Sequence, residues 1–257
     1  MAEDNYETVS IACINFHPVW GDKAANLAKM KAFVTEAAKQ GNNIIVFPEL
    51  ALSGYECSED AGDEKKSCRM HTELAETIPG PSTEEMSELA QKLDVYIIFG
   101  MPEQDKKNPA TRYISSVVVA PEGILGAYRK LHLAPWPRFT ESLCFSPGDE
   151  VPVWKTRYGN IGVLICYDFY FFPELARIMA LKEATLLVNT TASAAGLFAY
   201  IEFAGDAALA LAICWFAPNT WEMKHSSSRW SALVYGLLFA LCVVLLRRES
   251  PFLYFQF

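Results

Sequence analysis

The chain has 257 residues, 51% of them hydrophobic and 20% charged, and its formal net charge at pH 7 is -8. This length and composition predict one large globular domain with a substantial core, and they argue against long disordered tracts. The negative charge argues against a basic surface for a phosphate backbone, so nucleic acid is not expected as a partner.

The cysteines and the amino-terminal residues bear on the location of the protein. The seven cysteines form an odd set without CxxC pairs or paired Cys and His spacing: Cys13, Cys57, Cys68, Cys144, Cys166, Cys214 and Cys242. This pattern predicts neither a disulfide framework nor a metal site, and it favours a reducing compartment. The acidic residues 1–10 lack the charged-then-apolar pattern of a signal peptide, so we expect the protein in the cytoplasm.

The first part of the chain alternates between strand and helix patterns. Residues 9–15 are typical of a strand, and residues 22–40 have apolar side chains at helical spacing before Gly41 ends the helix. Residues 43–47 form a continuous apolar run, which fits a strand covered on both faces. Glu49 follows this run and is therefore expected at a strand tip.

A polar stretch, residues 53–66, is expected to be a loop. Ser82 and Glu85 are then typical of a capping box that opens a helix to about Leu93. Further strands are expected at 95–101, 114–120, 124–129, 151–156, 161–166 and 185–189, and another helix at 173–182. Strands that alternate with helices, interrupted by hairpins, predict a mixed-sheet α/β domain with both faces covered.

Three residues at predicted strand ends carry complementary chemistry: Glu49, Lys130 and Cys166. A cysteine attacks an amide or nitrile carbon as a thiolate, which a neighbouring base or cation makes available near neutral pH. The negative charge of the tetrahedral intermediate needs fixed donors, and one carboxylate can move the protons of both half-reactions. Taken singly, each residue also has an ordinary reading: Cys166 as an inert core residue, Glu49 and Lys130 as solvated surface groups.

The segments around these residues resemble a known family. They are IIVFPELALSGYE at 44–56, YRKLHL at 128–133, and GVLICYD with FPELAR within 162–177. In this order they resemble the signature segments of the nitrilase superfamily of carbon–nitrogen hydrolases, over about residues 8–200. The resemblance implies catalytic roles for Glu49, Lys130 and Cys166. It also implies an α/β fold, the four-layer α-β-β-α sandwich, and assembly into a homo-oligomer.

Four further residues are candidates for the site. Glu141 falls where the family often has a second glutamate that holds the lysine, although a loop carboxylate is an equal reading. The backbone N–H of Tyr167 follows the nucleophile at a strand-to-helix turn and is a natural oxyanion donor. Trp136 and Phe139 are candidates for the pocket wall, although aromatic loop residues also simply pack.

The residues after the cysteine indicate the kind of substrate. Cys166, Tyr167 and Asp168 resemble the amidase and carbamoylase branches better than the true nitrilases. We therefore expect a small amide or N-carbamoyl substrate, hydrolysed through a thioester acyl-enzyme with release of ammonia. Neither a metal nor an organic cofactor is expected.

The carboxyl-terminal part departs from the family. The four residues between Asp168 and Pro173 are more than the family usually has there, and the family's closing strands are not recognisable after Gly196. We therefore expect a hydrolase domain at 1–220, with a sandwich incomplete at its end, and an atypical apolar segment at 221–257. Residues 231–246 carry no charge and could form a membrane helix, although about 24 Å is short of a ~30 Å hydrocarbon core.

Two other readings of that segment, a buried core helix and an altered reading frame, stay open. If it is a membrane helix, we expect a tail anchor that leaves the catalytic domain in the cytoplasm. The departure also leaves two alternative functions beside the hydrolase. One is a membrane-associated acyltransferase that uses the same three residues, and the other is a truncated homologue without catalysis.

Overall fold

A computed structural model describes residues 9–15, 17–55, 64–134 and 141–192 of the chain. All of them belong to one compact unit, Met1–Ala192. The predicted boundary at residue 220 and the predicted membrane helix at 231–246 lie outside the described residues, so both stay predictions. Within the described ranges, no helix is long and apolar enough to cross a membrane.

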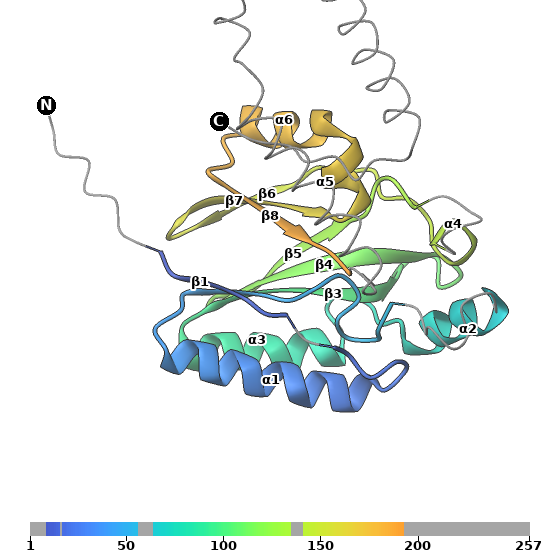
Figure 1. The fold of residues 1–257 in the computed structure, drawn as a ribbon, viewed down its shortest axis with the longest axis horizontal. Coiled ribbons are helices and arrows are strands. Elements are labelled where there is room, and N and C mark those ends of the chain that lie inside the picture. The colour runs from blue at the N-terminus through green and yellow to red at the C-terminus, as the bar shows by residue number, and fades with distance from the viewer. Residues whose placement is uncertain (1–8, 16, 56–63, 135–140, 193–257) are drawn as a thin grey trace, which may run out of the picture. The chain divides into compact units, whose positions relative to one another are not determined.

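Two β-sheets lie face to face between two layers of helices (Figure 1). Helices α1 (Lys23–Lys39) and α3 (Pro81–Leu93) cover the outer face of the larger sheet. Helices α5 (Tyr167–Phe171) and α6 (Pro173–Leu181) lie beyond the smaller sheet. The described part therefore has the α-β-β-α layers that the family resemblance implied.

The larger sheet is mixed. Its strand order is β1-β2-β3-β4-β5, with β1, β2 and β3 parallel and β3, β4 and β5 antiparallel. The strands are β1 (Ile11–Cys13), β2 (Ile44–Val46), β3 (Tyr96–Gln104), β4 (Arg112–Ala120) and β5 (Gly123–Arg129). The helices supply the crossovers that parallel neighbours need, and hairpins join the antiparallel ones.

The smaller sheet holds three strands in the order β6-β7-β8 within the described residues. They are β6 (Val153–Thr156), β7 (Gly159–Ile165) and β8 (Leu186–Thr190). The hairpin β6–β7 is antiparallel, and β7 pairs in parallel with β8 after the crossover through α5 and α6. The end of β7 is thus followed at once by a helical turn.

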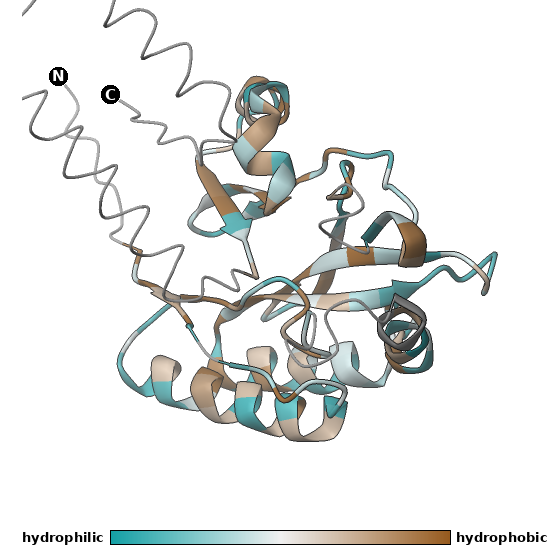
Figure 2. Cartoon of the chain, turned by 45° about the vertical axis from the view of Figure 1, so that its right-hand side comes forward, coloured by the Kyte–Doolittle hydropathy of each residue, from teal (hydrophilic) through white to brown (hydrophobic). Residues whose placement is uncertain are grey.

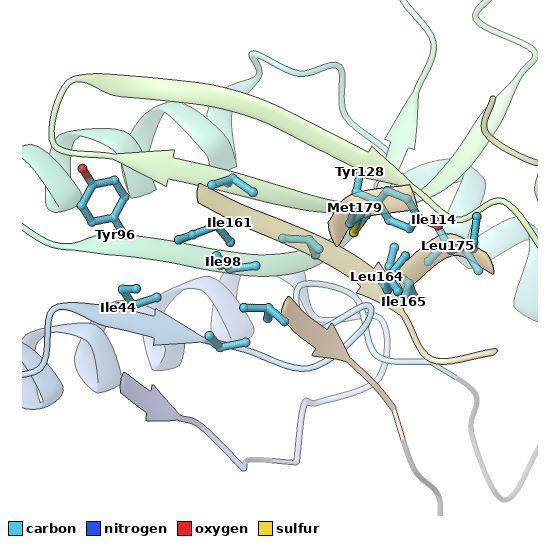
Figure 3. Packing of buried hydrophobic residues seen from close by; sticks show 14 of the residues in the cluster. Ile44, Tyr96, Ile98, Ile114, Tyr128, Ile161, Leu164, Ile165, Leu175 and Met179 are labelled. Atoms are coloured by element: carbon cyan, nitrogen blue, oxygen red, sulfur yellow. The ribbon is translucent and has the colours of Figure 1, made fainter. Parts of the chain in front are cut away.

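Two apolar cores hold these layers together, because successive side chains of a strand point to opposite faces. Ile97 and Phe99 of β3 belong to the core under α1 and α3, whereas Ile98 belongs to the core between the sheets. Hydrophobic and hydrophilic residues accordingly occur along both the strands and the helices (Figure 2). In the core between the sheets, Ile44, Ile98 and Ile114 lie near Ile161 and Ile165 (Figure 3). Each such buried side chain contributes roughly 1.5–3 kcal/mol to folding.

The helix ends agree with the sequence at α1 and differ at α3. The Asp22 side chain accepts a hydrogen bond from the Ala25 N–H at the start of α1, and Gly41 follows its end with φ of 82°. The predicted capping box of Ser82 and Glu85 is wrong. Pro81 occupies the first helical position, so the cap moves to Gly80, whose N–H donates to Thr83 Oγ1 at 2.8 Å.

Three helices were not predicted: α2 (Glu64–Leu74), α4 (Glu141–Cys144) and the short α5 that precedes α6. The expected loop at 53–66 therefore ends inside a helix. A disulfide bond joins Cys68 of α2 to Cys144 of α4, so the prediction of a chain without disulfides is wrong for this pair. Their separation of 76 residues carries no local signal, because only the fold brings the two helices together. The free cysteines of the described part are Cys13 and Cys166.

Candidate active site

Glu49 is the third residue after β2, in a turn that packs directly on β3. Gly100 of β3 makes this contact possible, because a Cβ atom there would lie 2.3 Å from the Leu50 nitrogen and 2.7 Å from the Glu49 Cα. Leu50 has φ of 48°, in the left-handed region that few side chains adopt. The Glu49 side chain is buried, and its Oε2 accepts a hydrogen bond from the Ala192 N–H at 3.1 Å.

Lys130 directly follows β5 and is completely buried. Its backbone is held on both sides: its N–H donates to the Ile114 carbonyl at 2.9 Å, and its carbonyl accepts from the Gly148 N–H at 2.8 Å. Its Nζ donates to Glu49 Oε1 at 2.8 Å and to Glu141 Oε1 at 2.7 Å. A buried ammonium group is thus paired with two carboxylates, which is the condition for keeping such a charge away from water.

Glu141, the first residue of α4, is buried and has further partners. Its Oε1 also accepts a hydrogen bond from the Tyr55 hydroxyl, and its Oε2 accepts from the Ala134 N–H at 2.7 Å. The structure therefore places Glu141 where a residue that holds Lys130 would be. Tyr55 was not singled out from the sequence, although it lies in the quoted segment 44–56.

Cys166 lies between β7 and α5 at a sharp turn. Its φ of 45° is unusual for a residue with a side chain, and such a conformation costs about 1–3 kcal/mol, which contacts of the surrounding structure must offset. The Cys166 N–H donates to the Thr190 carbonyl of β8 at 3.0 Å. The thiol is close enough to Glu49 and Lys130 for their charges to alter its pKa. The three predicted residues therefore form one electrostatic group.

Burial and charge set the protonation of this group. Burial raises the pKa of Glu49 to about 7, the charge of Lys130 opposes this rise, and the charge of Glu141 adds to it. Burial and the charge of Glu49 raise the pKa of the Cys166 thiol to about 12. Burial alone would lower the pKa of Lys130, but Glu49 and Glu141 outweigh it and raise that pKa. Near neutral pH the group thus contains a neutral thiol, a charged ammonium and a carboxylate poised to take a proton.

Of the remaining predicted site residues, the structure describes Tyr167 but not Trp136 or Phe139. Tyr167 is the first residue of α5, where a backbone N–H has no partner inside the helix, and its ring packs 4.5 Å from the ring of Phe171. Trp136 and Phe139 lie outside the described residues, so their role in the pocket stays a prediction. The described ranges contain no group of three or more His, Cys, Asp or Glu side chains that could hold a metal ion.

The comparisons with known proteins point to one family. A family model for carbon-nitrogen hydrolases matches residues 10–231. A probable nitrilase of Schizosaccharomyces pombe is 40% identical over 186 residues, which are 71% of this chain and 63% of the relative. The omega-amidase NIT2 of Homo sapiens is 37% identical over 173 residues, which are 65% of this chain and 57% of the relative.

A solved structure agrees with this result. Nit3 of Saccharomyces cerevisiae, a member of branch 10 of the nitrilase superfamily, matches with a TM-score of 0.61 and 28% identity. The match covers 72% of this chain and 65% of that chain. The layered sheets are thus those of a nitrilase-type fold. The chain belongs to the carbon–nitrogen hydrolase family of the nitrilase superfamily. It spans less than two thirds of the length of the curated relatives named here.

Proposed function

We propose that the protein hydrolyses a carbon–nitrogen bond of a small amide or N-carbamoyl compound and releases ammonia. One observation carries this proposal: the ammonium group of Lys130 is buried between Glu49 and Glu141, at 2.8 and 2.7 Å, beside the Cys166 thiol. A cysteine, a base and a fixed cation are the groups that acyl transfer through a thioester requires.

In the first half-reaction, Cys166 Sγ forms a bond to the carbonyl carbon while its proton passes to Glu49. A base with a pKa of about 7 suits this step, because the buried thiol does not ionise by itself near neutral pH. The carbonyl π-electrons move to oxygen, and that oxyanion accepts hydrogen bonds from Lys130 Nζ and the Tyr167 N–H. Glu49 then gives its proton to the leaving nitrogen, the C–N bond breaks, and ammonia departs.

In the second half-reaction, water attacks the thioester. Glu49 takes one proton of the water as the new C–O bond forms, and Lys130 again stabilises the oxyanion. When the C–S bond breaks, the proton on Glu49 returns to the sulfur, which restores the thiol and releases a carboxylic acid. The carboxylate of Glu141 keeps the ammonium of Lys130 in place throughout, since it accepts one of its hydrogen bonds.

Similarity to known relatives supports the proposed substrate class. Relatives with 37–40% identity include a probable nitrilase and an omega-amidase. Tyr167 and Asp168 after the nucleophile favour amide-type over nitrile substrates for this chain. We therefore propose a small amide, with N-carbamoyl compounds as the second group to examine.

Ammonia release from a panel of small amides, N-carbamoyl amino acids and nitriles tests the proposal. The wild-type protein is expected to release ammonia from at least one amide or carbamoyl compound, and Cys166→Ala is expected to release none. The matched control is Cys13→Ala, because Cys13 is the other free cysteine of the described part and is exposed. Equal rates for the wild type and Cys166→Ala would refute the role of this cysteine.

The same samples also test the two alternative functions, a membrane-associated acyltransferase and a homologue without catalysis. A membrane-associated acyltransferase would transfer the acyl group to an added amine or thiol in preference to water, and it would sediment with membranes. A homologue without catalysis would give neither product. The cytoplasmic tail-anchor prediction requires its own test, in which removal of residues 231–257 should move the protein from the membrane fraction to the supernatant and leave the reactivity of Cys166 unchanged.

A further inference from the structure

Asp168 lies two residues after Cys166, in α5, and its carboxylate is completely buried. Four hydrogen bonds satisfy its two oxygens. Oδ2 accepts from the Tyr128 hydroxyl at 2.7 Å and from the Leu131 N–H at 3.0 Å. Oδ1 accepts from the His132 N–H at 2.8 Å and pairs with His132 Nδ1 at 2.8 Å. A carboxylate that accepts this many bonds is held in one orientation.

All four donors come from residues 128–132, the segment that carries Lys130 in its middle. Tyr128 is the second-last residue of β5 and lies in the core between the sheets, where it is labelled in Figure 3. Leu131 and His132 begin the loop after the lysine. The imidazole of His132 also stacks on the Phe172 ring, with centroids 3.4 Å apart, at the junction of α5 and α6. The turn that presents the nucleophile is therefore bonded to the chain on both sides of the lysine.

We infer that Asp168 is a positioning residue, which fixes the Lys130 segment against the Cys166 turn so that the ammonium group stays beside Glu49 and the thiol. The inference rests on the proposed roles of Glu49, Lys130 and Cys166. Asp168 makes its four bonds to the lysine segment and is not itself assigned a step with the substrate. Its effect acts through the position of Lys130 Nζ, and errors of about 1 Å in such a position cost about a hundredfold in rate.

The pH dependence of Cys166 alkylation reports on the position of Lys130 Nζ relative to Glu49. Four groups face the Glu49 carboxylate: Lys130, Glu141, the Ala192 N–H and the Cys166 thiol. Of the charged ones, only Lys130 lowers the pKa of Glu49. If Lys130 moves away, the pKa of Glu49 rises, and the pH above which Glu49 accepts the thiol proton rises with it. Replacing a residue that only stabilises the fold would not shift the inflection of the alkylation rate against pH, as long as the variant is folded.

The experiment measures the rate of Cys166 alkylation by iodoacetamide from pH 5 to 10, by peptide mass spectrometry, in the wild type, Asp168→Asn, Tyr128→Phe and Asp94→Asn. Asparagine keeps the shape of Asp168 but replaces one acceptor oxygen with an amide NH2 group, which donates and would face two other donors. For Asp168→Asn we expect Cys166 alkylation at pH 8 to be at least tenfold slower than in the wild type. We also expect the inflection of its rate against pH to lie at higher pH. Tyr128→Phe removes one of the four bonds and should give a smaller shift in the same direction.

Asp94→Asn is the matched control. Asp94 is exposed and is bonded to Arg157 at 2.6 Å, so its removal should leave the profile of the wild type. If folded Asp168→Asn and Tyr128→Phe both reproduce the wild-type rate and inflection, the inference is wrong. Should Asp168→Asn fail to fold by circular dichroism, Tyr128→Phe decides: a shifted inflection supports the inference and an unshifted one overturns it. Ammonia release, measured in parallel, separates this result from failure of the proposed function, because alkylation does not require turnover.

Discussion

Lys130 and Glu49 form an ion pair of 2.8 Å in which both side chains are excluded from solvent. Removing both charges from water is costly, so such a pair persists only where further hydrogen bonds satisfy the remaining atoms. Here Glu141 accepts a second bond from Lys130, and the Ala192 N–H donates to Glu49. The arrangement places a base and a cation side by side in a dry site, where charge stabilisation is stronger than in water.

Replacement of Lys130 by methionine should destabilise the protein and abolish hydrolysis. The change would leave Glu49 and Glu141 buried without their shared cation, and breaking such a buried pair typically costs about 3–5 kcal/mol. Urea denaturation measures the loss, and ammonia release measures the activity. Lys155→Met is the control, since Lys155 is exposed on β6 and should give a change below about 0.5 kcal/mol. Similar losses for both variants would contradict the account.

The pH profile of hydrolysis should have an acid limb that reports on Glu49. The pKa of Glu49 is raised to about 7, chiefly by burial, so the base is protonated and inactive below this pH and becomes available as pH rises through it. kcat/KM should therefore increase through about pH 7. The charge of Glu141 contributes to the rise, so any residual activity of Glu141→Gln should show its limb at lower pH. A limb near the ordinary pKa of a glutamate would show that burial does not raise the pKa of the catalytic base and would contradict this prediction.

Replacement of Gly100 by alanine should displace Glu49. The added Cβ would lie 2.3 Å from the Leu50 nitrogen, which is a backbone atom and cannot rotate away. We expect a stability loss of roughly 1–3 kcal/mol and about a hundredfold loss of kcat. Gly41→Ala is the control, because it measures the cost of placing alanine at a glycine without a steric clash. Gly41 has φ of 82° but open space around it, so this variant should lose about 1 kcal/mol and keep its activity. Equal kcat losses would refute the proposed contact.

Reduction of the bond between Cys68 and Cys144 should lower the melting temperature. The bond closes a loop of 76 residues in the unfolded chain, and chain entropy alone then predicts up to about 4.5 kcal/mol of stabilisation. Thermal unfolding of the wild type with and without reductant measures the effect, and the double variant Cys68→Ser/Cys144→Ser should be insensitive to reductant. Cys13→Ser should respond as the wild type does. A wild type that melts at one temperature under both conditions would show that the bond does not form in solution.

Much of the fold follows from local patterns. The continuous apolar run 43–47 predicted a strand covered on both faces, and all three residues of β2 are buried between α1 and the smaller sheet. The positions of Glu49, Lys130 and Cys166 after predicted strands also followed from the sequence. The contacts that bring these three residues together could not be predicted. They are made by Gly100, Tyr55 and Ala192 between segments that are distant in the sequence. Their own neighbours in the sequence give no sign of these contacts.

Two errors, the misplaced cap of α3 and the missed helix α4, each have a physical cause. A proline at the first helical position moved the cap of α3 to Gly80, although Ser82 and Glu85 match the capping pattern. The short helix α4 has four residues, too few for periodicity to be visible, and it is fixed by the bond to Cys68 and by the contact of Glu141 with Lys130. Local patterns therefore predicted the strands and long helices better than the elements held by tertiary contacts.

The most direct test of the account is the mass of the protein during turnover. The wild type would be mixed with its best amide substrate, quenched in acid within milliseconds to seconds, and digested for peptide mapping. The account predicts an acyl adduct on the peptide that contains Cys166, with the mass of the substrate minus ammonia, and loss of this adduct when hydroxylamine is added. Steady release of ammonia without an adduct on Cys166, or with the acyl group on another residue, would contradict it.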